Sequence, residues 1–516
     1  MISESAFPLA ILVVTFLFAT LLLKIVRTTS EPTGALPPGP NPLPLLGNVH
    51  QLPSKEDWLT FSAWSKQYGD MFYLSIFGKP LIVVDSMKIA SDLLEKRSAK
   101  YSERPTFQMA GETMGWSLSV VLSQYGDRLK RYRKLLQTVL GPSSAPNFRQ
   151  LQLQEARQFA LRMIKTPEDL VQHIRHNAAA VIMKVAYGYE VSSTSDRYIS
   201  IAERALGLFA AATVPGAHLV DVFTWMRHLP GVTSSKVAKE GKAALMEMVE
   251  RPFKDVKKSL ETSPSDSHHS FVSINLSARN DDDDHIQWAA ASLYAGGADT
   301  TVSVVETFFL AMALYPDIQR KAQEEIDRVC IDAGDVNTRC LPTISDREAL
   351  PFTWAIYQEC LRWGVVTPCQ YHVSRDEDAY TLDKDLNKEV RIPARTLVVV
   401  NAWSILHNPD TYPRPFEFDP TRYLGENKKA QPDPRNVAFG WGRRRCPGIL
   451  LGDDYVFATI CTTLATLTIS NARSKAGVPI AVPRPDVEAD MWRYTTGSIS
   501  HPEPFDVTVV PRAGAT

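Results

Sequence analysis

The sequence predicts a mainly α-helical protein with small β-sheets, preceded by one transmembrane helix. Three observations predict this class: long segments with helical spacing, a few short strand-like segments near the two ends of the chain, and an uncharged apolar run close to the N-terminus. The chain has 516 residues, of which 44% are hydrophobic and 22% charged, with a net charge of −1. This composition is typical of a globular protein and gives no reason to expect a nucleic acid as a partner.

Residues 6–23 carry no charge and consist largely of Leu, Ile, Val, Phe and Ala. Such a run is long enough to span a bilayer. Lys24 and Arg27 follow it, and positive charge on that side predicts a cytosolic body behind the span. A cleaved signal peptide is the alternative, but a basic leading region and a small-residue cleavage site are not evident. We therefore expect residues 1–27 to be a retained single-pass anchor in the endoplasmic reticulum membrane.

Residues 28–43 contain the run Leu36-Pro37-Pro38-Gly39-Pro40-Asn41-Pro42. Prolines at this density exclude a helix and favour a stiff, extended hinge. A second polar stretch, Thr262–Asp284, predicts a surface loop whose last aspartates can cap the following helix. No other segment has the composition of a linker and no internal repeat is found, so residues 44–516 are expected to form one domain.

Helical spacing or good helix formers predict several helices in this domain. They cover Trp58–Tyr68, Ser86–Lys96, Asp127–Val139, Leu151–Ile164, Ser234–Leu260, Asp317–Val329 and the apolar run Ile449 to Leu467. Residues His285 to Tyr315 could form one longer helix that is apolar almost all round and therefore buried. Strands are expected at Met71–Ile76, Leu81–Asp85, Leu397–Val400 and Phe505–Val510.

The middle of the long apolar helix breaks local rules at Gly296-Gly297-Ala298-Asp299-Thr300-Thr301. Each glycine costs a helix about 1 kcal/mol, and a buried carboxylate is costly unless it is used or paired. Such violations in a core element indicate function. We interpret the segment as a weakened turn with room for a small ligand beside Asp299 and Thr300, which can handle protons. A packing glycine pair with a satisfied Asp–Thr hydrogen bond is the alternative.

Cys446 is the most informative single residue. It lies among glycines and next to Arg443-Arg444-Arg445, and Pro447 suits the first position of the helix that follows. Positive charge and a helix N-terminus both lower a thiol pKa, which predicts a thiolate able to bind a soft metal such as heme iron. Zinc is excluded because no second Cys or His lies within four residues. The other cysteines show no regular spacing, which suggests a reducing compartment.

The segment Phe439–Gly448 resembles the heme-binding signature of the cytochrome P450 superfamily at Phe439, Gly442, Arg444, Cys446 and Gly448. The resemblance extends from about residue 36 to the end and implies the cytochrome P450 fold with heme b as cofactor. Cys446 is then the axial ligand of the iron, Arg444 pairs with a heme propionate, and Phe439 packs near the sulfur.

Other motifs match the same family. The segment Gly296–Thr301 resembles its oxygen-side pattern, which implies that Asp299 relays protons and that Thr300 acts beside the oxygen. Glu359 and Arg362 match the Glu-x-x-Arg motif, with Arg422 as the third member of a structural ion-pair scaffold. Two further positions, Arg133 and His372, correspond to propionate contacts, although Leu129 stands where relatives usually carry Trp.

The resemblance implies a monooxygenase that inserts one atom of O2 into a lipophilic small molecule such as a terpenoid, polyketide or aromatic. Electrons would come from NADPH through a separate NADPH–cytochrome P450 reductase, because no flavin or nicotinamide fingerprint occurs in the chain. The overall sequence pattern is most similar to that of fungal microsomal members of the family that act on secondary metabolites or xenobiotics. The substrate pocket is expected to include Phe107, Met114, Trp116, Ala295, Val365, Val366 and Ile499.

Two other readings remain open: a thiolate-heme isomerase or dehydratase, and a membrane heme-binding protein without catalysis. The intact Asp299-Thr300 pair argues against both. The basic residues around Arg131 and Arg443 predict either a docking face for an acidic electron donor or a solvated cationic surface. A glycosylation sequon at Asn275 should face the cytosol and remain unmodified if the membrane orientation is right.

Overall fold

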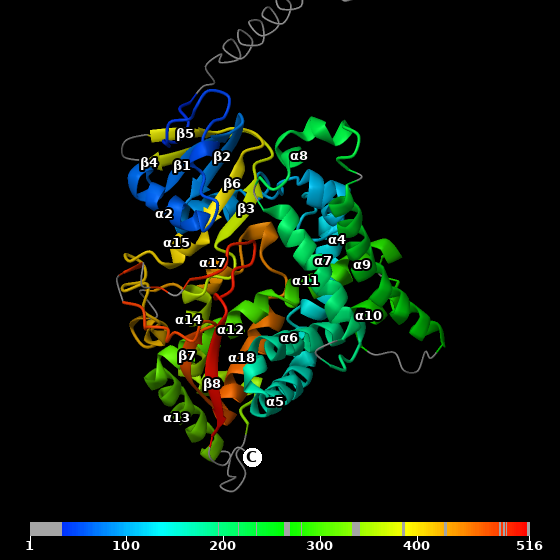
Figure 1. The fold of residues 1–516 in the computed structure, drawn as a ribbon, viewed down its shortest axis with the longest axis vertical. Coiled ribbons are helices and arrows are strands. Elements are labelled where there is room, and N and C mark those ends of the chain that lie inside the picture. Colours follow the sequence, from blue (N-terminus) through cyan, green and yellow to red (C-terminus); the bar gives the residue numbers. More distant parts are fainter. Residues whose placement is uncertain are drawn as a thin grey trace, which may run out of the picture.

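The computed structural model describes residues 34–512, except 194–195, 215, 234, 263–268, 280, 333–340, 384–387, 428–430, 485–486, 489–490 and 492. The predicted anchor, residues 1–27, and the first part of the hinge lie outside the described residues. Part of the predicted polar loop at 262–284 lies outside them as well, and the prediction of a surface loop was wrong for residues 271–277, which form a helix with a buried apolar side. In the described part, helices dominate and the strands form three small sheets, as the sequence predicts (Figure 1).

The described helices and strands alternate unevenly along the chain. The α-helices are α2 (Asp57–Tyr68), α3 (Met87–Ser91), α4 (Asp127–Leu140), α5 (Arg149–Lys165), α6 (Leu170–Tyr187), α7 (Arg197–Thr213), α8 (Leu219–Val222), α9 (Lys236–Thr262), α10 (Phe271–Ser277), α11 (Asp283–Gly297), α12 (Thr300–Leu314), α13 (Pro316–Asp332), α14 (Pro351–Trp363), α15 (Ala402–Leu406), α17 (Arg435–Ala438) and α18 (Ile449–Thr466). The strands are β1 (Met71–Ile76), β2 (Lys79–Val84), β3 (Cys369–Val373), β4 (Asp378–Asp383), β5 (Lys388–Ile392), β6 (Leu397–Asn401), β7 (Leu467–Ser474) and β8 (Phe505–Pro511).

The largest sheet has the order β1-β2-β6-β3 and lies at one end of the molecule with α2 and α15 (Figure 1). β1 and β2 form an antiparallel hairpin, whereas β2 pairs with β6 in parallel across more than 300 residues of sequence. The apolar run Leu397–Val400 pairs with a strand on each side; Val398–Val400 are buried and Leu397 is half-buried. Antiparallel pairs β4-β5 and β7-β8 make the other two sheets.

Five helices agree with the sequence prediction to within a few residues. They are α2, α4, α5, α9 and α13. The predicted helix at Ser86–Lys96 begins as α3 but continues from Asp92 to Lys96 as a π-helical turn. The apolar run from Ile449 forms α18, which ends at Thr466, because Leu467 already belongs to β7.

The long apolar segment 285–315 is interrupted where the glycine pair lies. α11 ends at Gly297 and α12 begins at Thr300, with Asp299 at φ −128° and ψ −37° between them. A Cβ at Gly297 would come 2.9 Å from the side chain of Ile182, so this glycine allows α11 to approach α6 closely. Nothing lies within 4 Å of a Cβ at Gly296. The two glycines therefore have different roles: one allows close packing, and the other borders open space.

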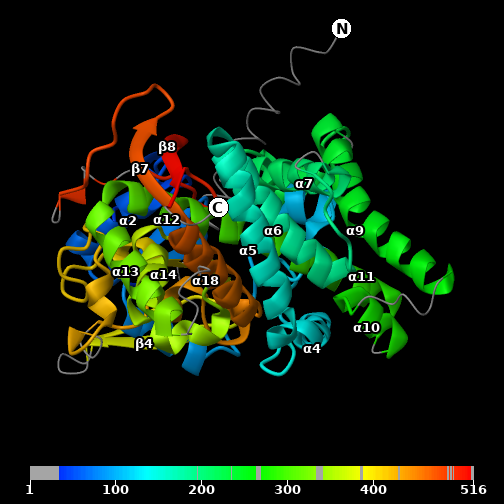
Figure 2. The ribbon, with the colours of Figure 1, turned by 90° about the horizontal axis from the view of Figure 1, so that it is seen from below.

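Two helical segments in the described residues have the length and hydropathy of membrane spans, namely Asp283–Leu314 and Ile449–Thr466. Within their most apolar windows 67% and 83% of the residues are buried inside the protein. Figures 1 and 2 show α12 and α18 in the middle of the molecule, with α5 on one side and α14 on the other. Their hydropathy is that of core helices.

The buried side chains form two large clusters. One surrounds α11, α12 and α18, and the other joins the β1-β2-β6-β3 sheet to α2 and α15. Phe439 packs against the first cluster and Trp441 belongs to the second. The loop that carries Cys446 therefore spans the boundary between the two cores.

Asn275 of the predicted sequon is fully buried in α10. Its amide donates to Phe271 O (2.8 Å) and to Thr138 Oγ1 (3.0 Å). A glycan on this side chain is incompatible with the folded domain. The glycosylation state of Asn275 therefore gives no information on the orientation in the membrane.

Candidate functional site

The loop between α17 and α18 holds Cys446 in a fixed turn. The Cys446 N–H donates to Phe439 O (2.8 Å), and the Trp441 indole donates to Gln370 on β3 (2.8 Å). Gly442 has φ +47°, and a Cβ there would overlap the carbonyl oxygen of Leu94. Glycine is therefore required at this position both for its conformation and for space. The loop is held from both sides before any ligand is present.

Two expectations for Cys446 need correction. α18 begins at Ile449 with Gly448 as its N-cap, so Pro447 is not the first helical residue and Cys446 lies two residues before the cap. Burial raises the pKa of the Cys446 thiol above its ordinary value, and the Gly448 N–H and Arg133 offset this only in part. Coordination to a metal ion deprotonates a thiol.

Three arginines extend from Cys446 to β3 without an acidic partner. Arg133 on α4 donates to Arg445 O (3.0 Å). Arg444 donates only to backbone carbonyls, those of Ser102 (2.7 Å), Ser123 (2.6 Å) and Val120 (3.5 Å). Arg104 donates to Val121 O (3.1 Å) and Tyr371 O. Among the described residues, none of these three guanidiniums has a carboxylate within ion-pair distance.

The pKa values of these arginines reflect the lack of a neighbouring negative charge. Burial lowers the pKa of Arg444 to about 9, helped by the nearby charges of Arg104 and Arg133. Burial also lowers the pKa of Arg104 to about 10. Buried charges are normally paired, because an unpaired one is costly. The cluster thus fits an anionic ligand. Arg104 was not recognised from the sequence, where nothing local distinguishes it.

His372 on β3 is buried beside this cluster. Its Nδ1 donates to Tyr101 O (2.9 Å), since a carbonyl can only accept. Burial, with Arg104 and Arg444, lowers the pKa of His372 to about 3, so the ring is neutral. A carboxylate placed against Nε2 would reverse this preference by favouring the imidazolium.

These residues fit a heme group on two grounds. A cysteine sulfur lies on a rigid loop, and uncompensated cations next to it match the two carboxylates that a heme carries. The Cys446–Ile449 segment is also half-exposed although the helix after it is buried. A Cβ at Gly448 would meet only the Cys446 sulfur, at 3.8 Å.

Residues 295–301 form an uncovered stretch within an otherwise buried helix pair. Gly296 is exposed and its neighbours are half-buried, whereas most of the residues of α11 before it and of α12 after Thr301 are buried. Thr300 Oγ1 donates to Gly296 O (2.7 Å), and Thr301 Oγ1 donates to Gly297 O (2.8 Å). These bonds replace part of the helical ladder that is lost at the break. The alternative of a direct Asp299–Thr300 hydrogen bond is not observed.

Asp299 instead lies between two basic side chains. His501 Nε2 is 3.3 Å and Arg175 Nη1 is 3.5 Å from Asp299 Oδ1. Burial alone would raise the pKa of Asp299. The positive charges of His501 and Arg175 outweigh burial, so the pKa of Asp299 lies below its ordinary value. His501 also contacts Glu306 on α12. Neither His501 nor Glu306 was selected from the sequence; a carboxylate two turns after Asp299 in an apolar helix was the available signal.

Glu359 is the centre of a fully buried ion-pair group. Arg362 binds it with two hydrogen bonds (2.8 and 2.9 Å), and Arg422 Nε binds Oε1 (3.2 Å). Tyr423 OH and Asp419 N–H donate to the same carboxylate (3.0 and 2.9 Å). The remaining guanidinium protons reach backbone carbonyls of the segment 413–417 and Leu406. The group ties α14 to the chain that leads into the Cys446 loop.

The residues expected to line a substrate pocket differ in exposure. Phe107, Ala295, Val366 and Ile499 are half-buried. Met114 and Trp116 are almost fully buried, where Met114 packs on Gly241 of α9 and Trp116 on Phe209 of α7. Val365 is also buried. Their place in a substrate pocket stays a prediction.

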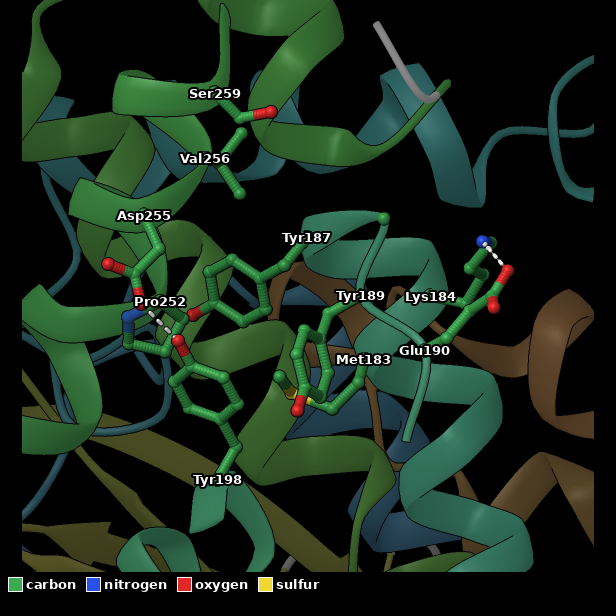
Figure 3. Close-up of a pocket in the computed structure, with 11 residues that line it drawn as sticks. Met183, Lys184, Tyr187, Tyr189, Glu190, Tyr198, Pro252, Asp255, Val256 and Ser259 are labelled. Carbon is green, nitrogen blue, oxygen red and sulfur yellow. Dashed lines mark hydrogen bonds and ion pairs between the residues drawn. The ribbon is translucent and has the colours of Figure 1, made fainter. Parts of the chain in front are cut away.

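A separate pocket of about 420 Å³ opens between α6, α7 and α9. Figure 3 shows Tyr187, Tyr189 and Tyr198 around it, with Tyr198 donating to Asp255. None of the residues predicted for the substrate or the heme lines it.

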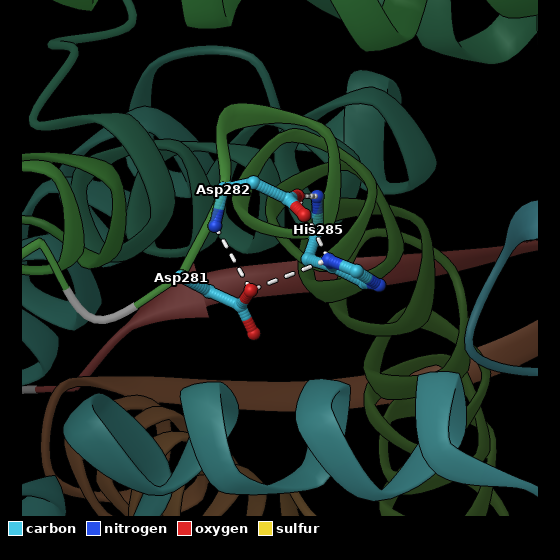
Figure 4. A group of neighbouring side chains, drawn as sticks. All are labelled: Asp281, Asp282 and His285. Carbon is cyan, nitrogen blue, oxygen red and sulfur yellow. Dashed lines mark hydrogen bonds and ion pairs between the residues drawn. The ribbon is translucent and has the colours of Figure 1, made fainter.

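The acidic run after the polar loop is used for local contacts (Figure 4). Asp282 caps α11 by accepting from His285 N (2.9 Å), as the sequence predicts. Asp281, Asp282 and His285 lie close enough to hold a cation, but the His285 ring already bonds Asp282 (2.8 Å). Asp284 and Asp281 pair with Arg128 and Arg131 of α4.

Comparison with known proteins identifies the family. Residues 37–480 match the family described as Cytochrome P450. The chain is 38% identical over 505 residues to Cytochrome P450 monooxygenase 208 of Postia placenta, covering 96% of this chain and 94% of that protein. It is 37% identical to Cytochrome P450 monooxygenase claR of Ampulloclitocybe clavipes (95% and 88% covered) and 35% identical to Tryptamine 4-monooxygenase of Psilocybe cyanescens (92% and 93%). The chain therefore belongs to the cytochrome P450 family and is a heme-thiolate monooxygenase of that family.

Proposed function

We propose that this monooxygenase inserts one atom of O2 into a lipophilic terpenoid, polyketide or aromatic compound while anchored in the endoplasmic reticulum membrane. Two electrons come from NADPH through a separate NADPH–cytochrome P450 reductase, two protons come from solvent, and the second oxygen atom leaves as water. The observation that carries the site assignment is the chain of cations Arg133, Arg444 and Arg104 beside Cys446, which lacks any acidic partner in the described residues.

The cofactor in this proposal is heme b, and Cys446 holds its iron. Arg444, Arg104 and Arg133 bind the propionates, with His372 as an additional donor once it takes up a second proton. Phe439 and Gly448 border the sulfur side. When bound, the heme supplies the activation of oxygen and the oxidation of the substrate. The protein supplies position, charge and protons.

The protons reach the oxygen side through Asp299 and Thr300. Asp299 lies at the break between α11 and α12 and is 25% exposed, so it can exchange protons with solvent. Thr300 Oγ1 donates its hydrogen to Gly296 O, which leaves its lone pairs free to accept a hydrogen bond from a neighbouring donor. General acid catalysis by a positioned group is typically worth about 10²- to 10⁴-fold in rate.

An apolar surface supports contact with a membrane beyond the anchor. Leu43, Leu45 and Leu46 are exposed beside the β1-β2 hairpin, where Phe77 N–H donates to Leu46 O. The rings of Phe77 and Phe223 are tilted by 59° with their centroids 5.2 Å apart; Phe223 follows α8, and Leu219 and Trp225 nearby are about 60% exposed. Carbonate washing of membranes tests this: protein without residues 1–27 should remain partly membrane-bound.

The predicted electron-donor face is smaller than its sequence suggests. Arg128 and Arg131 are paired with aspartates, which leaves Lys134, Arg443 and Arg445 without an ion pair among the described residues. We propose these three as the contacts for an acidic reductase. The KM for reductase should then rise with ionic strength.

The substrate class is tested by expressing the chain with a reductase and profiling metabolites under ¹⁸O2. The name of Tryptamine 4-monooxygenase, which is 35% identical to this chain, gives an aromatic compound as its substrate. Aromatic compounds are therefore included among the candidate substrates. One ¹⁸O atom in a product supports the proposal. No NADPH-dependent product across terpenoid, polyketide and aromatic panels would contradict it.

Replacing Arg444 by Leu is expected to weaken heme retention by roughly 10- to 100-fold, because a hydrogen bond to a charged group is worth about 1.5–3 kcal/mol. The heme-to-protein ratio after dialysis against apomyoglobin measures this. Arg443→Leu is the matched control, since Arg443 is exposed and contacts Tyr125 at the surface. Equal heme loss from both variants would contradict the role of Arg444.

A further inference from the structure

The loop 494–502, which precedes β8, is fastened along one polar stripe of α12. Ser303 Oγ donates to Ser500 O (2.6 Å), and the hydroxyls of Thr307 and Tyr494 are 3.1 Å apart. The loop is also closed on itself, with Thr495 N–H donating to His501 O (2.7 Å). Ser303 and Thr307 are fully buried. Polar groups in a core helix are thus satisfied by a loop some 190 residues away.

His501 joins this loop to two carboxylates on the same stripe. Its Nδ1 is 2.8 Å from Glu306 Oε2, and its Nε2 is 3.3 Å from Asp299 Oδ1. The side chains of His501 and Glu306 are only 16% and 6% exposed. Glu306 has no other cation within ion-pair distance among the described residues. Carboxylate oxygens within 3.3 Å of both ring nitrogens favour the imidazolium, which carries a proton on each nitrogen.

Asp299 is less firmly held than Glu306. Its Oδ1 has Arg175 at 3.5 Å in addition to His501, yet it makes no hydrogen bond of good geometry to either. A buried carboxylate oxygen without a hydrogen bond is uncommon. This oxygen is placed by charge alone, and it can turn toward another partner without breaking a hydrogen bond.

We propose that His501 is a positioning residue of the monooxygenase reaction: as an imidazolium it clamps the loop 494–502 to Glu306 and places Asp299 for proton delivery. The inference rests on the proposed role of Asp299. The same loop carries Ile499, a predicted substrate contact, so contact with the substrate and the position of the proton donor are mechanically linked through one side chain.

The charge state of His501 follows from the groups that face it. They are Asp299 at the helix break, Glu306 on α12, Arg175 on α6 behind Asp299, and Tyr494 of its own loop, which adjoins Glu306. Burial lowers the pKa of His501, but the two carboxylates outweigh it and raise the value to about 9. The charged His501 therefore stabilises the fold fully below the ordinary histidine pKa of about 6.5, and this stabilisation is lost as the pH rises through about 9.

The test compares His501→Gln with His501→Arg in the heme-loaded protein. Two readouts are followed from pH 7 to 10. One is the thermal unfolding midpoint, and the other is the coupling, meaning the fraction of consumed O2 that appears as product rather than hydrogen peroxide. In the wild type both should fall in one step near pH 9. His501→Gln should show low coupling and no step near pH 9. His501→Arg, which keeps the cation but does not titrate in this range, should restore coupling and also lack the step.

Ser303→Ala is the matched control, because it loosens the same loop without altering the charges; its step near pH 9 should persist. Coupling lost equally in His501→Arg would show that the imidazole itself must transfer the proton, and would overturn a positioning role. A step near pH 9 that survives in His501→Gln would also overturn it. If Asp299→Asn leaves the coupling unchanged, the proposed function of Asp299 is wrong. If Asp299→Asn lowers the coupling but neither His501 variant does, only the role of His501 is wrong.

Discussion

Glu359→Ala is expected to give protein that contains almost no heme. The carboxylate accepts hydrogen bonds from Arg362, Arg422 and Tyr423, and both arginines are almost fully buried. Removing one partner of a buried ion pair typically costs about 3–5 kcal/mol, because the remaining charge is stranded. A domain has only about 5–15 kcal/mol of net stability, so this loss is a large part of the total.

The loss should fall on the heme site because Arg422 belongs to the segment leading to the Cys446 loop. The measurement is Soret absorbance per mole of purified protein, together with the unfolding midpoint. Glu247→Ala is the matched control: Glu247 pairs with Arg251 on the exposed face of α9, where an ion pair is worth about 0–1 kcal/mol. A normal heme content in Glu359→Ala would refute the scaffold role.

Thr300→Ala and Asp299→Asn are expected to lower product formation by roughly 10²-fold or more, the usual contribution of positioned acid–base groups. Oxygen consumption should continue, with hydrogen peroxide released in place of product, because reduction of oxygen does not require these side chains. Substrate affinity should change little. The measurement is the ratio of product to peroxide per NADPH consumed, at saturating reductase.

Thr301→Ala provides a close control for Thr300→Ala. Both hydroxyls donate to a carbonyl four residues back, at 2.8 and 2.7 Å, so both substitutions remove the same local helix contact. Only Thr300 directly follows Asp299 and matches the catalytic position of the family motif. Equal peroxide release from both variants would assign the effect to helix distortion rather than to proton delivery.

The sequence predicted those elements whose signal is local. Helices such as α4 and α5 have polar and apolar faces that repeat every turn, and the glycine pair marked the break between α11 and α12. α6, most of whose residues are buried, was not predicted, and α7 was missed although it has distinct polar and apolar faces. The strands β3, β4 and β5 were not predicted and are only five or six residues long, although β4 and β5 are neighbours in sequence and pair with each other.

The candidate site follows the same rule. Cys446, Arg444, Asp299 and Thr300 lie in short motifs and could be named in advance. Arg104 and His501 could not, because each acquires its role from residues about 200 or more positions away in sequence. The pKa of Cys446 was misjudged for a related reason: neighbouring arginines are visible in sequence, whereas the burial that outweighs them is not.

The most direct test of the account is the carbon monoxide difference spectrum of the reduced protein. If Cys446 is the axial ligand of the iron as a thiolate, the wild type should show the red-shifted Soret band that marks thiolate ligation. Cys446→His, which offers a nitrogen ligand, should keep heme but lose the red shift, while Cys461→Ser on buried α18 should retain it. A wild-type spectrum without the red shift, or a red-shifted band that survives in Cys446→His, would contradict the central claim.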